Sequence, residues 1–358
     1  MRYRNRFQLR INTHIHPRVA KVVCNKNNYR APMSLLWQTI TEVYPPSPKF
    51  TENDLPDLTG KVYLITGATA GIGLELLRIL FWKNATVYVA ARNRELFREV
   101  TEKIMETPAI GTKALSLGRM ELILMDLADL PSIKPGVEEL LSKTKKLDSV
   151  WYNAGVMMPP EGSKTIQGYE LQWGVNVVGH FLLNRYLTPT IIESAKGASV
   201  DSVRIMWVAS DANNFAPSPD GINWNDVNFE KTEGSMFLKY AQSKAGDIIL
   251  GYEMAERIRG TGVLSLSLNP GHLRSNLFRS RPPWHQKLSA LFSFDPRLGA
   301  LTEIFVGFSP NINMSHNGGY FVPWGRFGTP RGSIHEGLEK RDTGKRLWEM
   351  LESETEMY

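Results

Sequence analysis

The sequence contains almost no cysteine. Cys24 is the only cysteine in 358 residues, which excludes an intrachain disulfide and a structural metal site built on cysteine. This composition is typical of a protein that works in a reducing compartment. Five histidines are scattered without the spacing of metal ligands, so we expect no metal: His180, His272, His285, His316 and His335.

Long hydrophobic runs are also absent. No stretch of about 18 apolar residues is present, so we predict no membrane-spanning helix. Nor is there the apolar core of a secretory signal peptide. We expect a cytoplasmic protein and leave peripheral membrane contact open, because Leu35, Leu36 and Trp37 could rest against the domain or against a membrane surface.

Acidic residues are missing from residues 1–32, which hold eight of the 42 Lys and Arg residues. The rest of the chain has 34 basic residues against 36 acidic ones. The body therefore has no basic excess, and the overall charge of +6 does not indicate nucleic-acid binding.

Two interpretations of residues 1–32 stay open. The segment is Arg-rich and acid-poor, like a mitochondrial presequence, or it is an unstructured extension ahead of Met33. We favour the second, because serines are few and Pro17 and Pro32 would interrupt a long amphipathic helix. We predict an extension and an extended arm over residues 1–57, one domain over 58–330, and a tail helix within 331–358.

The stretch from Gly60 to Gly73 organises the domain. An apolar strand over 62–66 runs into three glycines, and an amphipathic helix follows them. Glycine lets the backbone approach a pyrophosphate, and the N–H groups and dipole of the helix start favour its negative charge. We therefore predict a dinucleotide site here.

Beyond this unit, short apolar strands alternate with amphipathic helices. Expected strands lie at 85–93, 120–127, 148–155, 204–210 and 262–271. Expected helices cover 94–106, 132–143 with a break near Pro135, 168–187 and 237–258. Such alternation is typical of an α/β, doubly wound parallel sheet, the Rossmann fold. We also predict a small substrate lid near the C-terminus of this single domain.

The end of the second strand decides which cofactor is favoured. About 20 residues beyond the glycines, an acid would select NAD and an arginine would accommodate the 2′-phosphate of NADP. Arg92 stands there between Ala91 and Asn93, with no acid beside it. The planar donors of Arg92 suit a phosphate, so we predict NADP(H).

Tyr240 and Lys244 are four residues apart in a segment with a helical pattern, so they share one face. A nearby ammonium favours the phenolate form and lowers the pKa of a phenol, which makes it usable for proton transfer. The pair alone is weak, because most such pairs lie on a surface.

The motifs together resemble the short-chain dehydrogenase/reductase family over residues 58–323. The resemblance implies that the catalytic residues are Asn176, Ser210, Tyr240 and Lys244. It implies cofactor contacts from Thr66, Gly67, Gly71, Ile72, Gly73, Arg92, Asp126, Leu127, Asn153, Ala154, Gly155, Tyr240, Lys244, Pro270, Gly271 and Ser275.

Within the family, the chain resembles fungal members of the retinol dehydrogenase-like branch. The features behind this are the 30 residues from Ser210 to Tyr240 and the C-terminal sequence GGYFVPWGR. Two departures are Tyr152, where many members have Asn, and the lack of the membrane anchor common in the animal enzymes. We interpret Tyr152 as a tolerated packing change.

The resemblance also implies the roles of the catalytic residues. Tyr240 donates a proton to the carbonyl oxygen, and Ser210 hydrogen-bonds the same oxygen. Lys244 holds the nicotinamide ribose and depresses the Tyr240 pKa, while Asn176 orders a water in the proton relay. The implied activity is an NADPH-dependent carbonyl reductase, with alcohol oxidation as the reverse.

The variable part after Gly271 is expected to set the substrate. We predict a lid over 278–294, within a substrate loop at 272–300, and an apolar ketone, aldehyde or alcohol such as a polyketide, terpenoid, steroid or retinoid-like compound of secondary metabolism. Two other functions remain as alternatives: a non-catalytic NADP(H)-binding regulator on the same fold, and an epimerase or dehydratase, whose glycine spacing would differ. The oligomeric state stays open.

Overall fold

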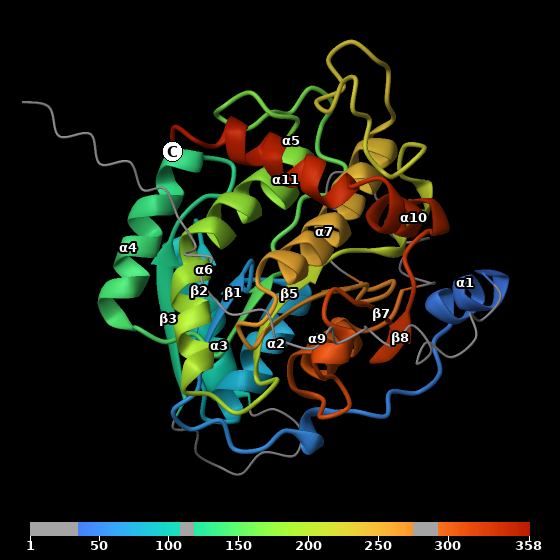
Figure 1. The fold of residues 1–358 in the computed structure, drawn as a ribbon. Coiled ribbons are helices and arrows are strands. Elements are labelled where there is room, and N and C mark those ends of the chain that lie inside the picture. Colours follow the sequence, from blue (N-terminus) through green and yellow to red (C-terminus); the bar gives the residue numbers. More distant parts are fainter. Residues whose placement is uncertain (1–34, 108–117, 275–292) are drawn as a thin grey trace, which may run out of the picture.

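The computed structural model describes residues 35–107, 118–274 and 293–358. Within these ranges one sheet runs through the molecule, with helices on both of its faces (Figure 1). The strand order is β3-β2-β1-β4-β5-β6-β7-β8, and only β8 runs antiparallel to its neighbour. The strands are β1 Val62–Thr66, β2 Thr86–Ala91, β3 Arg119–Leu124, β4 Ser149–Tyr152, β5 Val203–Val208, β6 Val263–Leu268, β7 Tyr320–Val322 and β8 Arg326–Gly328.

Helices α4, α6, α7 and α11 cover one face of the sheet, and α2, α3 and α9 cover the other. The helices are α1 Leu35–Val43, α2 Gly71–Trp82, α3 Arg94–Glu106, α4 Ile133–Lys143, α5 Leu171–Trp173, α6 His180–Lys196, α7 Met236–Arg257, α9 Pro296–Phe308, α10 Gly332–Lys340 and α11 Thr343–Glu354. A π-helical segment, Gly174–Gly179, joins α5 to α6. The predicted doubly wound parallel sheet is confirmed.

Both faces of the sheet are buried, which explains the almost continuous apolar runs of its strands. In β1, Leu64 belongs to the core under α4, α6 and α7, while Tyr63 and Ile65 belong to the core under α2 and α9. Tyr152 is also buried, stacks 4.6 Å from Trp207 and hydrogen-bonds Asn184. It fits the interior as a packing residue.

Several elements differ from the prediction. Strands β7 and β8 and helix α9 were not predicted, and the expected helix over 168–187 consists of α5, the π-helical segment and α6, which continues to Lys196. Helix α4 continues through Pro135, because this proline lies in the first turn, where the backbone needs no N–H donor. Residues 331–358 hold two helices, α10 and α11, instead of one.

Helix α1 precedes the predicted domain and packs against its far end. The Gln38 side chain donates to the Thr329 carbonyl at 2.8 Å, and Arg326 donates to the Thr41 carbonyl at 2.6 Å. Glu42 is buried and accepts a hydrogen bond from Asn269 at 3.0 Å. We expected an extended arm here, with Leu35, Leu36 and Trp37 against the domain or a membrane surface, but residues 35–43 form a helix.

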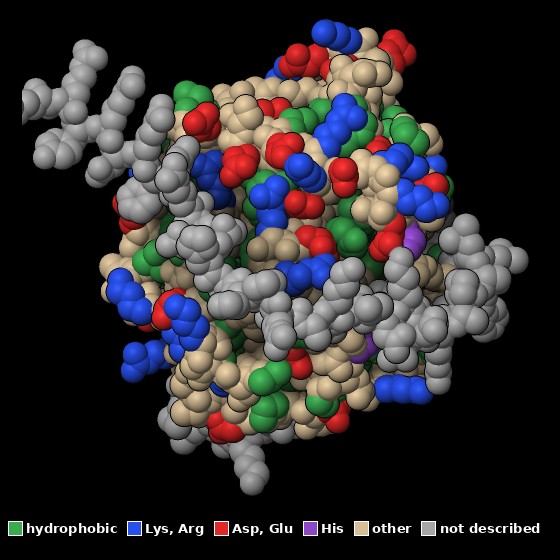
Figure 2. Space-filling view, in the orientation of Figure 1, with side chains coloured by type: hydrophobic (Ala, Val, Ile, Leu, Met, Phe, Trp, Pro, Cys, Tyr) green, Lys and Arg blue, Asp and Glu red, His purple; other side chains and the backbone are tan. Residues whose placement is uncertain are grey.

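The surface carries both signs of charge. On the face shown in Figure 2, Lys and Arg side chains are interspersed with Asp and Glu. Among the described residues, no helix is both long and apolar enough to cross a bilayer.

Candidate active site

A cleft of about 530 Å³ opens where the parallel strands end. Its walls come from the loops after β1, β2, β3, β4 and β5, together with α7 and Pro270. The strand order reverses direction between β1 and β4, and ligands of doubly wound folds bind at this switch point. The elements that carry the predicted cofactor and catalytic residues therefore meet at one place.

The glycine turn after β1 forms a cradle for an anion. Gly67 has a positive φ of 70°, and a Cβ there would lie 2.7 Å from the Ala154 Cα. A Cβ at Gly73 would meet the Asn153 side chain. Helix α2 begins at Gly71 with no side-chain cap on its first N–H groups. These free donors and the close backbone approach fit the pyrophosphate of a dinucleotide.

Thr66 ties this turn to the loop after β4. Its hydroxyl oxygen accepts from the backbone N–H groups of Asn153 and Ala154, both at 2.9 Å. The hydroxyl hydrogen is then left for Nε2 of His180, also at 2.9 Å. With Nε2 as acceptor, the protonated Nδ1 of His180 donates to the Asn176 carbonyl at 2.9 Å.

His180 was not predicted as a site residue, because a lone histidine in an apolar stretch carries no motif. Burial lowers its pKa to about 3, although its hydrogen bond to Asn176 acts in the opposite direction. The ring is therefore neutral, as the hydrogen-bond pattern requires. His180 connects the glycine turn to the helix that carries the predicted catalytic asparagine.

The π-helical segment turns Asn176 toward the cleft wall. A Cβ at Gly179 would lie 2.7 Å from the Leu127 carbonyl oxygen, so only glycine fits there. The Asn176 carboxamide accepts from the Val156 N–H at 2.8 Å and donates to the Ser243 hydroxyl at 2.9 Å. Its side chain thus links the loop after β4 to α7, and π-bulges of this kind often occur at functional sites.

Lys244 is buried and has two fixed partners. Its ammonium donates to the Val208 carbonyl at 2.8 Å and to the Asp247 carboxylate at 2.9 Å. Burial is the largest single influence and lowers the Lys244 pKa, but the charge of Asp247, the interaction with Tyr240 and the hydrogen bond to Asp247 together raise it overall. Asp247 was missed in the sequence analysis, although its position three residues after Lys244 puts it on the same helical face.

Tyr240 lies at the cleft with Lys244, whose Nζ is 5.8 Å from the centre of its ring. Burial raises the Tyr240 pKa, and the charge of Lys244 lowers it by less. The charge of Lys244 thus acts in the expected direction, but the Tyr240 pKa is raised overall, because burial is the larger effect and the charge of Asp211 adds to it.

Ser210 ends the loop after β5 and caps the short 3₁₀ helix Asp211–Phe215. Its hydroxyl donates to Asp211 at 2.9 Å, and the other carboxylate oxygen of Asp211 lies 2.6 Å from Nε2 of His272. A side-chain hydrogen bond with Ser210 acts to lower the Tyr240 pKa. The Asp211–His272 pair carries no family motif and was not predicted.

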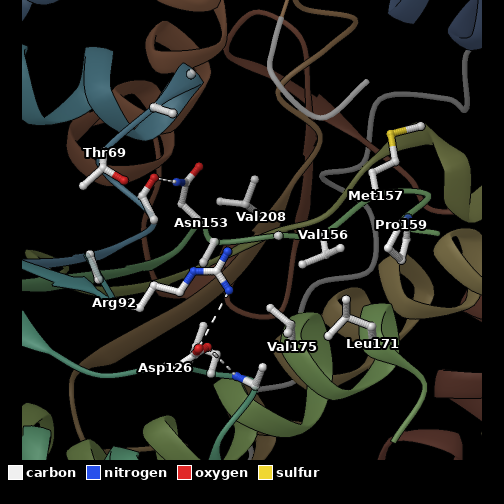
Figure 3. A pocket seen from close by; sticks show the side chains of 18 of the residues that line it. Thr69, Arg92, Asp126, Asn153, Val156, Met157, Pro159, Leu171, Val175 and Val208 are labelled. Atoms are coloured by element: carbon white, nitrogen blue, oxygen red, sulfur yellow. Dashed lines mark hydrogen bonds and ion pairs between the residues drawn. The ribbon is translucent and has the colours of Figure 1, made fainter. Parts of the chain in front are cut away.

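Arg92 and Asp126 mark the other end of the cleft. Figure 3 shows the Arg92 side chain reaching across toward Asp126, with 3.8 Å between the charged atoms. The Arg92 side chain is 65% exposed, so its guanidinium remains accessible to a ligand. Leu127, Asn153, Ala154 and Gly155 line the cleft between this end and the buried lysine.

Pro270 lines the cleft beside Tyr240 and Lys244. Gly271 follows with φ of 98°, and its N–H donates to the Asn269 side chain at 3.0 Å. Ser275 lies outside the described residues, as does nearly all of the predicted lid over 278–294.

Apolar side chains line the cleft where a substrate would approach Tyr240. In Figure 3, Val156, Met157, Pro159, Leu171 and Val175 surround this side of the cleft.

Comparison with known proteins decides the family. Residues 61–215 match the family model described as short chain dehydrogenase. A short-chain dehydrogenase/reductase of Phomopsis amygdali is 38% identical over 327 residues, covering 88% of this chain and 96% of that protein. The chain belongs to the short-chain dehydrogenase/reductase family.

Other fungal members of the short-chain dehydrogenase/reductase family are equally similar. One of Emericella nidulans, pkfC, is 39% identical and covers 87% of this chain and 97% of its own length. One of Armillaria gallica is 37% identical and covers 91% of this chain and all of its own length. The specific resemblance to the retinol dehydrogenase-like branch stays a prediction.

Solved structures support the fold. An uncharacterised protein from Mycobacterium paratuberculosis has a TM-score of 0.61 at 25% identity, covering 87% of this chain and 98% of that one. The Pseudomonas aeruginosa RhlG/NADP complex has a TM-score of 0.56 at 20% identity, covering 81% of this chain and all of that one. The Rossmann fold predicted for this oxidoreductase is confirmed.

Proposed function

We propose that this protein is an NADPH-dependent carbonyl reductase that oxidises the corresponding alcohol in the reverse direction. The observation that carries the proposal is that Ser210, Tyr240 and Lys244 converge beside a cleft that also contains the glycine cradle. A dinucleotide extended from Arg92 toward Lys244 would bring its reactive ring to the phenol.

A bound nicotinamide would supply the hydride. The carbonyl carbon gains this hydride, and the π electrons of the C=O bond move to oxygen. Tyr240 gives its phenolic proton to that oxygen, which completes the alcohol and leaves a phenolate that recovers a proton from solvent. The buried charge of Lys244 stabilises the phenolate, which is the form whose charge develops during the reaction.

The proton-transfer step is tested by Tyr240→Phe. Turnover of carbonyl substrates, followed by NADPH absorbance, should fall by about two to four orders of magnitude. NADPH binding, measured by fluorescence, should survive. An unchanged turnover would remove Tyr240 from the mechanism. A complete lack of turnover by the wild-type protein on ketones, aldehydes and alcohols, with NADPH binding intact, would favour the non-catalytic regulator.

NADP(H) is favoured over NAD(H) by the charge at the end of β2. Arg92 is exposed there, and its ion pair with Asp126 is long at 3.8 Å, so the guanidinium can take a 2′-phosphate bidentately. Arg92→Ala should raise the KM for NADPH far more than that for NADH. A wild-type preference for NADH would overturn this part of the proposal.

The substrate is proposed to be an apolar ketone, aldehyde or secondary alcohol. The side chains of Met157, Leu171 and Val175 give that part of the cleft an apolar wall. The resemblance to fungal members of the retinol dehydrogenase-like branch suggests a substrate from secondary metabolism, such as a polyketide or terpenoid. A preference for small polar ketones over bulky apolar ones in a substrate panel would contradict this class.

A further inference from the structure

The Ser210 hydroxyl is hydrogen-bonded to Asp211, which in turn contacts His272. It donates to one oxygen of Asp211, and His272 contacts the other oxygen, at 2.9 and 2.6 Å. The carboxylate lies between the serine and the histidine, so the order differs from that of a hydrolase triad, in which the imidazole meets the serine. Asp211 acts on the hydroxyl as an acceptor.

A hydroxyl has one hydrogen and two lone pairs. While the Ser210 hydrogen points to Asp211, one lone pair accepts from the Ala212 N–H at 3.2 Å. Ser210 also forms a side-chain hydrogen bond with Tyr240, which uses its remaining lone pair. To hydrogen-bond the substrate oxygen, the serine must first turn its hydrogen away from Asp211.

The strength of the Asp211 bond depends on the charge beside it. Hydrogen bonds to an ionised group are stronger than neutral ones. When His272 is protonated, its charge compensates that of Asp211, and the carboxylate competes less well for the serine hydrogen. When His272 is neutral, the uncompensated carboxylate holds the hydrogen more firmly.

His272 can respond to the solvent because its side chain is 42% exposed. The hydrogen bond to Asp211 raises the His272 pKa above 6.5, burial opposes this, and the negative charge of Glu42 on α1 adds to the rise. Burial raises the pKa of Glu42 itself to about 7, with Asp211 contributing. The pKa values of His272 and Glu42 are therefore both raised.

Other charged and titratable groups face this cluster from several elements. Arg326 on β8 faces Glu42, and Tyr320 on β7 faces both Glu42 and Asp211. From α7, Tyr240 interacts with Asp211 and is itself next to Lys244. The experiment must therefore distinguish the effect of His272 titration from the effects of Glu42 and Tyr240 titration.

We propose that the Asp211–His272 pair positions the Ser210 hydrogen, so that a charged His272 frees this hydrogen for the substrate oxygen and speeds reduction and oxidation alike, whereas a neutral His272 slows both. The proposal rests on the proposed reductase function. His272 and Asp211 act through Ser210 as positioning residues. No proton from either residue enters the product, because Tyr240 supplies the transferred proton.

The kinetic test is the pH profile of kcat/KM in both directions. For the wild type, kcat/KM for reduction should fall by about tenfold relative to His272→Gln as pH rises through the His272 pKa, above 6.5, and kcat/KM for oxidation should fall by the same factor relative to that variant. His272→Gln should lose this limb of the pH profile. His335→Gln, on the exposed part of α10, is the matched control and should keep it. Glu42→Gln should keep the limb and shift it to lower pH, since Glu42 raises the His272 pKa.

A second readout requires no turnover. NMR titration of histidine-labelled full-length protein should give a His272 midpoint above 6.5, assigned by its loss in His272→Gln. In Asp211→Asn this midpoint should move down. These results together would support the proposal that Asp211 and His272 position the Ser210 hydrogen.

Three results would overturn the proposal. The limb could persist unchanged in His272→Gln, it could disappear in Glu42→Gln alone, or the His272 midpoint could stay fixed in Asp211→Asn. In each case the wild type would still reduce carbonyls, so only this inference would fail. A wild type without any NADPH-dependent turnover would instead refute the proposed function and this inference with it.

Discussion

Asp247→Asn tests how far Lys244 depends on its buried counter-charge. Nζ of Lys244 and Oδ2 of Asp247 are 2.9 Å apart, and the side chains are 6% and 3% exposed, respectively. At an effective dielectric constant of about 20, such a pair attracts by about 6 kcal/mol, most of which offsets the cost of burying two charges. Removing one partner leaves the other charge uncompensated. The free energy of unfolding at pH 7 should therefore fall by about 3–5 kcal/mol.

The pH dependence of this effect follows from the Lys244 pKa. In the wild type it is raised above 10.5 by Asp247, so the pair contributes stability below that pH and loses it as pH rises through the folded-state pKa. In Asp247→Asn the negative charge that raises the Lys244 pKa is gone, so burial lowers the pKa of this lysine. Stability of the variant should therefore improve from neutral toward alkaline pH relative to the wild type.

Urea unfolding of the wild type, Asp247→Asn, Lys244→Met and the double variant measures the coupling directly. We expect the double variant to be more stable than Asp247→Asn, because it contains no unpaired buried charge. Two results would refute the reasoning. Asp247→Asn could be as stable as the wild type, or the double variant could lose as much free energy of unfolding as the two single variants together.

Three further predictions concern residues around the site and core. Burial raises the pKa of Glu303 well above 4.5, and its carboxylate oxygens have no partner, so the free energy of unfolding of the wild type should fall by about 1 kcal/mol over the first pH unit above 4.5. Glu303→Gln should remove this loss in urea titrations at several pH values, unlike the exposed control Glu339→Gln. The His180 pKa is lowered to about 3, so its contribution to stability is present above 6.5 and declines as pH falls. His180→Phe should abolish that acid decline and cost about 2 kcal/mol at pH 7 through two lost hydrogen bonds, and equal stability of variant and wild type at pH 7 would contradict the bonding scheme. Gly179→Ala should raise the KM for NADPH, because its Cβ would push on the Leu127 carbonyl beside the cleft, whereas Gly197→Ala, where nothing lies within 4 Å, should leave it unchanged.

The sequence was sufficient for strands β1 to β6 and the glycine turn because their signals are local, whereas β7 and β8, with three residues each, are too short to show a periodic pattern. An apolar run ending in glycines specifies a strand, a turn and a helix start within 14 residues, from Gly60 to Gly73. The alternation of strands and helices then indicates a doubly wound parallel sheet with right-handed crossovers. Periodicity placed α3 and α7 closely, but it did not show the π-helical segment before α6 or the position of Pro135 in the first turn of α4.

The polar network around the site could not be predicted in the same way. Asp247 could have been found by its spacing from Lys244, but His180 gains its role from contacts with Thr66, 114 residues earlier. Asp211 and His272 are 61 residues apart and meet only because β5 and β6 are neighbours whose ends lie at the same edge. Long-range pairs of this kind depend on the assembled fold.

The contacts of α1 have a consequence for synthesis of the chain. Gln38 and its partner Thr329 are separated by 291 positions, and Glu42 and Asn269 by 227. At a ribosomal rate of about 10 residues per second, α1 must wait about 30 s for its docking surface. Most of the nucleotide-binding sheet can form in that interval. The acid that α1 brings to the His272 cluster is therefore among the last groups to arrive, so the nascent chain can acquire its cofactor cradle well before the environment of its serine is complete.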